Sequence, residues 1–215
     1  MMRRWGARFS PSSLGSGRKA VSDSKVGFTA ERSRRDAQVV YLGISGVLHP
    51  SKTTYELVHR RSFWDDGHAL YECVPLLDSA LQRWPDARIV LTSTLPWAQG
   101  LPSVLEQLGP LASRVDGFTF EDLTQRAKRT VKTRNGTTRT VPYYEDDYWR
   151  MTKAAIVAAH VAWLQPREWV AIDDEDYLWS TARDHLVATD PCLGLRDAAA
   201  WDRLLTLLEG NFGEG

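Results

Sequence analysis

The chain has 215 residues, of which 43% are hydrophobic and 25% charged, a composition typical of a soluble globular protein with one sizeable core. No apolar run approaches the roughly 20 residues that a membrane-spanning helix needs. The net charge of zero hides an asymmetry, because residues 1–35 carry nine Lys/Arg against two acidic residues. The remainder of the chain is therefore acidic, which argues against a broad nucleic-acid surface on it.

The first part of the chain differs in composition from the rest. Residues 1–36 are rich in Ser, Gly and Arg and show no apolar periodicity, so we predict a disordered basic tail. The same composition suits an organelle transit peptide, and a start-site extension is the other interpretation. Cys73 and Cys192 form no CxxC pair, and we interpret both as buried apolar side chains in a reducing, cytoplasmic setting.

Residues 37–212 alternate short apolar runs with segments of helical periodicity, which favours an α/β fold with a parallel sheet. Two inserts, at 51–73 and 120–148, are expected to lie over the carboxyl ends of the strands. The predicted strands cover residues 38–43, 87–91, 117–120, 168–172 and 185–188. The predicted helices cover residues 74–84, 102–108, 151–164 and 196–208. The apolar stripe expected on the last helix consists of Ala199, Trp201, Leu204, Leu205 and Leu208.

Polar residues that follow predicted strands are the candidate site, because ligands of open α/β sheets bind at the carboxyl ends of the strands. Thr92 and Ser93 offer hydroxyl groups for a phosphate oxygen, and Lys153 on a predicted helix can neutralise phosphate charge. Asp173 and Asp174 offer carboxylates for a divalent cation. The structural alternative is that the hydroxyls and acids cap helices and turns and that the lysine is solvated.

The order of these segments resembles the four motifs of the haloacid dehalogenase (HAD) superfamily. The resemblance covers roughly residues 38–210 and is strongest to the HAD domains of RNA-repair proteins. It implies a three-layer sandwich with a parallel central sheet, Mg²⁺ as cofactor and phosphatase chemistry. The residues that carry it are Gly43-Ile44-Ser45-Gly46-Val47-Leu48-His49-Pro50, Ile89-Val90-Leu91-Thr92-Ser93-Thr94, Lys153 and Trp169-Val170-Ala171-Ile172-Asp173-Asp174.

The first motif departs from the family pattern at both reactive positions. In the family, one aspartate attacks phosphorus and ligates Mg²⁺, and a second acts as general acid and base; Gly43 and Ser45 stand at these positions. Glycine has no side chain, and the pKa of a serine hydroxyl is too high for efficient proton transfer near neutral pH. We therefore expect a degenerate site that binds a phosphorylated small molecule or a partner without catalysis. Asp173 and Asp174 would remain as ligands of a weakened Mg²⁺ site.

Two other functions stay open. The first is an active Mg²⁺-dependent phosphatase with a rearranged nucleophile, acting on a phosphomonoester or a nucleic-acid end. The second is a nucleic-acid adaptor that uses a basic hairpin at residues 126–141, indicated by Asn135-Gly136 between β-branched arms. The structural alternative for this hairpin is that its charges prevent edge pairing. Its basic residues are Arg126, Lys128, Arg129, Lys132, Arg134 and Arg139.

Overall fold

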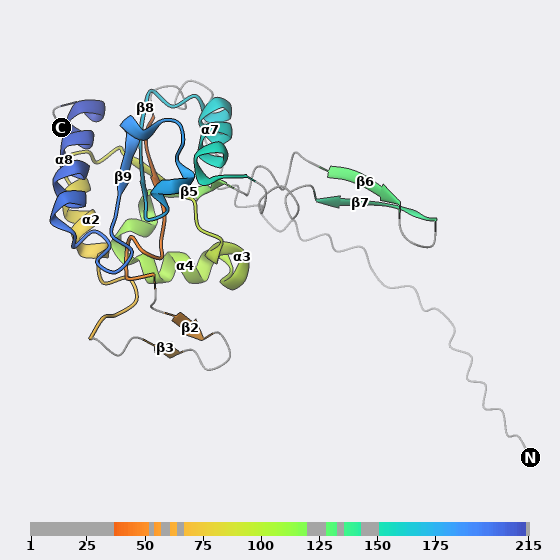
Figure 1. Cartoon of the computed structure of the whole chain (residues 1–215), viewed down its shortest axis with the longest axis horizontal. Coiled ribbons are helices and arrows are strands. Elements are labelled where there is room, and N and C mark those ends of the chain that lie inside the picture. Colours follow the sequence, from red (N-terminus) through yellow and green to blue (C-terminus); the bar gives the residue numbers. More distant parts are fainter. Residues whose placement is uncertain are drawn as a thin grey trace, which may run out of the picture.

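The computed structural model describes residues 37–51, 54–56, 61–63, 67–119, 128–132, 136–142 and 151–213. Its centre is a sheet of five parallel strands in the order β5-β4-β1-β8-β9 (Figure 1). These strands are β1 (Gln38–Leu42), β4 (Arg88–Leu91), β5 (Val115–Phe118), β8 (Glu168–Asp173) and β9 (Leu186–Ala188). The α/β fold with a parallel central sheet is thereby confirmed.

Helices cover both faces of the sheet, as Figure 1 shows for α7 on one side and for α2 and α8 on the other. Two of the four longer helices begin at a residue whose side chain accepts a backbone N–H bond: Thr152 caps α7 and Asp197 caps α8. The helices are α2 (Val74–Leu81), α3 (Leu95–Gln99), α4 (Leu101–Leu108), α7 (Lys153–Leu164) and α8 (Ala198–Phe212).

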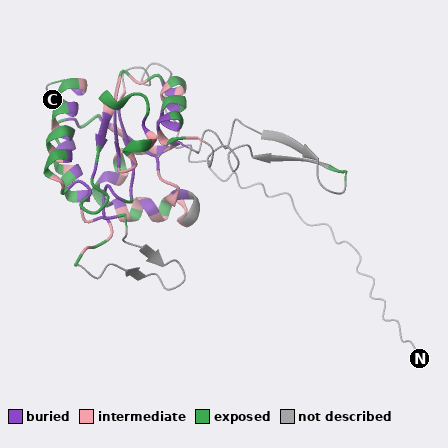
Figure 2. Ribbon diagram, in the orientation of Figure 1, coloured by how far each residue is buried: buried purple, intermediate pink, exposed green. Residues whose placement is uncertain are grey.

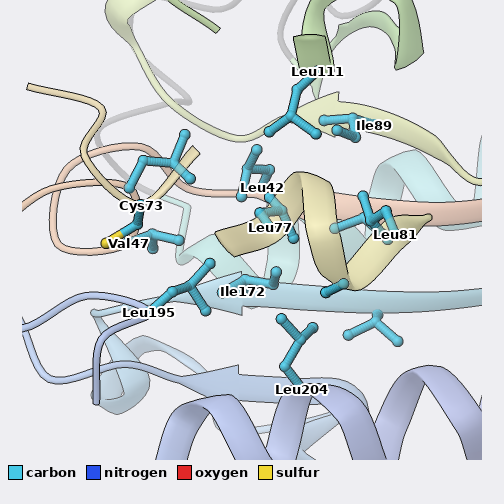
Figure 3. Packing of buried hydrophobic residues seen from close by; sticks show 14 of the residues in the cluster. Leu42, Val47, Cys73, Leu77, Leu81, Ile89, Leu111, Ile172, Leu195 and Leu204 are labelled. Carbon is cyan, nitrogen blue, oxygen red and sulfur yellow. The ribbon is translucent and has the colours of Figure 1, made fainter. Parts of the chain in front are cut away.

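The core consists of two clusters, one on each face of the sheet, and Figure 2 shows the buried residues concentrated in the sheet and on the inner helix faces. The larger cluster joins the sheet to α2, α4 and α8, with Leu77, Leu108 and Leu204 from these helices. Figure 3 shows side chains of this cluster, with Leu77 from α2 and Leu204 from α8 near Ile172 of the sheet. The smaller cluster joins the sheet to α7. Central strands buried on both faces explain the uninterrupted apolar runs of the sequence.

Two short antiparallel hairpins lie outside the central sheet. The first pairs β2 (Thr54–Glu56) with β3 (Arg61–Phe63). The second pairs β6 (Lys128–Lys132) with β7 (Thr138–Pro142), and it extends away from the sheet in Figure 1. Both hairpins fall within the predicted inserts. The prediction that the inserts cover the carboxyl ends of the strands remains a prediction.

Some expectations from the sequence are wrong. Cys192 is exposed, whereas Cys73 is buried as expected, because Cys192 lies in a surface turn after β9. Ala199 is exposed on α8, and Ala200 takes its place in the core. The buried stripe of α8 also continues to Phe212, because the helix runs one turn further than predicted. The predicted disordered tail lies outside the described residues.

None of the helices in the described part of the chain combines the length and apolar character that a membrane crossing requires.

Candidate functional site

Three of the residues singled out from the sequence lie side by side at the carboxyl edge of the sheet. Gly43 follows β1, Thr92 follows β4, and Asp173 ends β8. Backbone hydrogen bonds continue the ladder to this edge: the Gly43 N–H donates to the Ile172 carbonyl at 2.9 Å, and the Thr92 N–H donates to the Leu42 carbonyl at 2.9 Å. The pairing of three strands therefore brings together residues that are up to 130 positions apart in the sequence.

Lys153 joins the site because it is the first residue of α7, the helix that covers this face of the sheet. Its Nζ atom lies 3.2 Å from Oδ2 of Asp173 and 3.6 Å from Oε2 of Glu175. The other carboxylate oxygen of Asp173, Oδ1, accepts the Glu175 N–H at 3.0 Å. Asp173 is only 1% exposed, so these bonds compensate for the loss of water around its charge.

Gly43 lies beside this ion pair, and its surroundings leave little room for a side chain. A Cβ atom on Gly43 would lie 3.3 Å from Oδ2 of Asp173 and 3.1 Å from both the Ile172 carbonyl oxygen and a Val47 methyl group. A side chain at this position would therefore point toward Asp173. It would also require its neighbours to move by a few tenths of an ångström.

Asp174 packs against the first-motif turn. A Cβ atom on Gly46 would overlap the Asp174 carboxylate, and Gly46 has a φ of +73°, so glycine is required here for both reasons. Burial and the neighbouring charge of Asp173 raise the pKa of Asp174 to about 6, although the charge of Lys153 opposes this shift. A considerable fraction of the Asp174 carboxyl groups is therefore protonated in mildly acidic solution.

Ser45 is exposed, in contrast to the other residues of the turn. The turn around it is held by contacts from the loop after β9. The Thr189 hydroxyl donates to the Gly46 carbonyl at 2.7 Å, and the Leu195 N–H donates to the Val47 carbonyl at 3.0 Å. These bonds fix the backbone of the turn and leave the Ser45 side chain at the surface.

The two candidate hydroxyls of the second motif differ in their bonding. The Ser93 hydroxyl oxygen accepts the Leu95 N–H at 3.2 Å, which is a local bond at the start of α3. The Thr92 hydroxyl is buried and has no hydrogen-bond partner among the residues that the structure describes. Of these two hydroxyls, that of Ser93 is thus already used by a local bond, and that of Thr92 is not.

Sequence reasoning missed Thr119, which directly follows β5 and is as deeply buried as Thr92, at 1% exposure. The predicted strand covers residues 117–120 and therefore places Thr119 inside the strand. The observed strand ends at Phe118, so Thr119 lies at the carboxyl edge of the sheet. Its position after an apolar strand was the available signal. Thr189, which holds the first-motif turn, was missed for a similar reason: its role depends on a partner 143 residues away.

The described residues do not form a ready Mg²⁺ site of the kind the HAD resemblance implies. Both oxygens of Asp173 already accept hydrogen bonds, and Gly43 contributes no carboxylate. Within the part of the chain that the structure describes, no three His, Cys, Asp or Glu side chains are grouped so that they could hold a metal ion. The ammonium group of Lys153 is the cation nearest to Asp173 in this arrangement.

The basic hairpin is described only in its backbone. Arg129 pairs with Val141 across the two strands, and Arg139 pairs with Val131, so both arginines lie on the same face of the ribbon. Lys128 and Lys132 lie on the other face. Arg126, Arg134 and Asn135 lie outside the described residues. The two faces of the ribbon thus carry equal numbers of basic residues in the described part.

The strand order, the two helical layers and the polar carboxyl edge define an α/β protein of the HAD-like three-layer class. Residues 39–200 match the family model described as the HAD domain in Swiss Army Knife RNA repair proteins, and the chain belongs to this family. No curated protein and no solved structure matches the chain.

Proposed function

We propose that this chain is a catalytically degenerate HAD protein that binds a phosphorylated ligand without hydrolysing it. The observation that carries the proposal is Gly43, because its Cβ position faces Asp173 at the carboxyl end of the central strand. A carboxylate that attacks phosphorus would have to stand there, and glycine supplies none. Ser45, at the position of the second reactive aspartate, is exposed and is a poor proton donor and acceptor near neutral pH.

The remaining side chains support binding. Lys153 supplies positive charge at the start of α7, and Thr92 supplies a buried hydroxyl without a partner. Asp173 orients Lys153 through the 3.2 Å contact and is itself neutralised by it. These groups are suited to hydrogen bonding and charge compensation of phosphate oxygens, which is the part of phosphoryl chemistry that needs no nucleophile.

Hydrolysis of p-nitrophenyl phosphate in the presence of Mg²⁺ tests the loss of catalysis. The comparison includes the natural protein, Asp173→Ala, and the double variants Gly43→Asp/Ser45→Asp and Gly43→Asn/Ser45→Asn. The asparagine pair has nearly the same volume as the aspartate pair but provides no anionic nucleophile. Activity in the aspartate variant alone supports a site that lost catalysis through these two positions.

Activity in the natural protein that disappears in Asp173→Ala contradicts the proposal. It supports instead an active Mg²⁺-dependent phosphatase in which another group attacks phosphorus. Calorimetric titration with inorganic phosphate tests the binding half of the proposal separately. We expect saturable binding to the natural protein that weakens in Lys153→Met, and no binding to the natural protein contradicts the proposal even if all variants are inactive.

Binding of RNA through the β6–β7 hairpin is a second candidate function. Two observations favour it: the basic residues on both faces of the ribbon, and membership of a family described by its occurrence in RNA repair proteins. A basic ribbon contacts the phosphate backbone through charge, so binding should weaken steeply as salt concentration rises.

The register provides a matched test of the RNA candidate. Arg129→Gln/Arg139→Gln and Lys128→Gln/Lys132→Gln each remove two positive charges, but from opposite faces. If one face contacts RNA, the variant of that face loses more affinity for a single-stranded RNA oligonucleotide and has a smaller salt dependence. Equal small losses indicate a general charge effect, and unchanged affinity in both variants removes the candidate.

A further inference from the structure

Two buried hydroxyl groups without partners lie at the same edge of the sheet. In the described part of the chain, the buried side-chain polar atoms that lack a hydrogen-bond partner include the hydroxyl oxygens of Thr92 and Thr119. Both residues are 1% exposed. Folding removes water from these hydroxyls and returns no protein bond, which is unfavourable unless another molecule supplies the partner.

Strand pairing places the two threonines next to each other. Leu91 of β4 pairs with Phe118 of β5, so the following residues, Thr92 and Thr119, are neighbours across the pair. Adjacent strands lie about 4.8 Å apart, which is close enough for both hydroxyls to reach one ligand group.

The alternation of side chains along β4 puts Thr92 on the face covered by α7. Val90 packs in the core cluster on the α7 side, and Thr92, two residues later, points the same way. Phe118 packs against the opposite cluster, and Thr119 is the first residue after the end of β5. Gly43 and Asp173 lie on the α7 side as well, because Asp173 contacts Lys153 of α7.

Two parts of this edge differ in charge: the end of β8, which carries Asp173, and the ends of β4 and β5, which Thr92 and Thr119 follow. Asp173 lies two strands away from Thr92, a separation of about 10 Å, and its carboxylate is paired with Lys153. Gly43 stands between the two parts and has no side chain. An anionic group between these two parts therefore has neutral hydroxyl donors on one side and, on the other, an Asp173 carboxylate whose charge Lys153 compensates.

Thr189 is a natural comparison for these residues. It also follows a strand of the same sheet and is 5% exposed, but its hydroxyl donates to the Gly46 carbonyl at 2.7 Å. A buried threonine after a strand is thus bonded within the protein when its role is structural. Thr92 and Thr119 have no such bond.

We infer that Thr119 is a second ligand-binding hydroxyl that, together with Thr92, donates hydrogen bonds to the oxygens of a tetrahedral oxyanion, a phosphate or sulfate group. The inference rests on the proposed function, because it adds a residue to the same site. The proposed ligand site then extends from the carboxyl ends of β8, β1 and β4 to the carboxyl end of β5. The choice of a phosphate or sulfate group follows from the phosphorylated ligand of the proposed function.

The test compares Thr92→Val, Thr119→Val and Thr189→Val, which each replace a hydroxyl by a methyl group of similar size. Thermal denaturation is measured without ligand and with inorganic phosphate, and Kd values for phosphate and for sulfate are measured by calorimetry. We expect Thr119→Val to keep or raise the Tm of the ligand-free protein, since its hydroxyl loses no partner. We expect its Kd for phosphate to rise about tenfold or more, because a hydrogen bond to a charged group is lost.

The control Thr189→Val should behave in the opposite way, with a lower Tm and an unchanged Kd. A Thr119→Val variant that loses stability while its phosphate Kd is unchanged overturns the inference and shows a structural hydroxyl. If Thr92→Val weakens phosphate binding and Thr119→Val does not, the inference fails and the proposed function stands. If the natural protein binds neither phosphate nor sulfate, both fail together. A comparison of the two Kd values identifies which oxyanion the site prefers.

Discussion

Nζ of Lys153 lies 3.2 Å from Oδ2 of Asp173, and this contact connects the start of α7 to the end of β8. The carboxylate is 1% exposed and the lysine side chain 16% exposed, so the pair is largely removed from water. An ion pair in this position stabilises the fold only while both members are present, since either charge alone is unfavourable in the interior. The same pair supplies the positive charge of the proposed ligand site.

Removing the lysine charge should therefore destabilise the protein. We expect Lys153→Met to lower the free energy of unfolding by about 2–4 kcal/mol, because the buried Asp173 carboxylate loses its cation. The measurement is urea denaturation followed by circular dichroism. The double variant Lys153→Met/Asp173→Asn should recover part of the loss, and Lys153→Arg should lose less than Lys153→Met. Additive effects of the two single substitutions in the double variant would contradict a direct interaction.

Restoring a carboxylate at the end of β1 should create a response to Mg²⁺. Gly43→Asp brings a second carboxylate beside Oδ2 of Asp173, so the variant should be less stable than the natural protein and should regain stability when Mg²⁺ is added. The natural protein should show little change. Gly43→Ala separates the steric cost of the new Cβ from the effect of charge, and Gly43→Asn adds a neutral side chain of the same shape. An equal Mg²⁺ response in Gly43→Asn and Gly43→Asp would exclude a carboxylate-bound ion.

The buried His49 should make stability depend on pH. Burial lowers the pKa of His49 to about 4, although the charge of Glu72 opposes this shift, and Nδ1 accepts the Tyr71 N–H at 3.3 Å. The folded-state pKa is thus below the unfolded value of about 6.5, so stability is complete above that pH and falls as the pH decreases toward 4.

His49→Asn tests this dependence because its side-chain oxygen can still accept the Tyr71 N–H while the titrating group is removed. Between about pH 7.5 and about pH 5, the natural protein should lose about 2 kcal/mol more of its free energy of unfolding than the variant. The measurement is urea denaturation at both pH values. Parallel losses in the two proteins would show that His49 does not contribute.

Three glycines should respond differently to alanine. Gly194 has a φ of +58°, and a Cβ atom there would overlap the Val47 carbonyl oxygen of the first-motif turn, so Gly194→Ala should cost more than about 2 kcal/mol. Gly46→Ala should also cost more than about 2 kcal/mol, because φ is +73° and the new Cβ atom would lie 2.6 Å from the Asp174 Cβ atom, which rotation of that side chain does not move. Gly210 lies inside α8 with no atom within 4 Å of its Cβ position, so Gly210→Ala should stabilise by about 0.5–1 kcal/mol. Thermal denaturation measures the three changes, and a Gly46→Ala or Gly194→Ala variant as stable as the natural protein would contradict the expected overlap.

Most of the fold followed from local patterns. The continuous apolar runs ending at Leu42, Leu91 and Ile172 predicted parallel strands buried on both faces, and the structure has strands there. Helical spacing predicted α2 and α7 within a few residues of their ends. The ends were less accurate, as in α8, because capping bonds and tertiary packing decide where a helix begins and ends.

The candidate site was only partly predictable. Thr92, Lys153 and Asp173 were found because each stands at a recognisable place after a strand or on a helix, and the order of the motifs indicated that the fold would bring them together. Thr119 was not found, because its neighbour Thr92 comes from another strand and because the predicted strand end was two residues too late, which placed Thr119 inside the strand.

The sequence by itself determined the class of fold, the family and the presence of Gly43 and Ser45 in the first motif, since apolar periodicity and residue identity are local properties of the chain. Only the tertiary structure decided which polar groups have partners. It paired Lys153 with Asp173, bonded the Thr189 hydroxyl to the Gly46 carbonyl and left the hydroxyls of Thr92 and Thr119 buried without a bond. The physical reason is that burial and hydrogen bonding depend on how distant segments pack, which no single segment specifies.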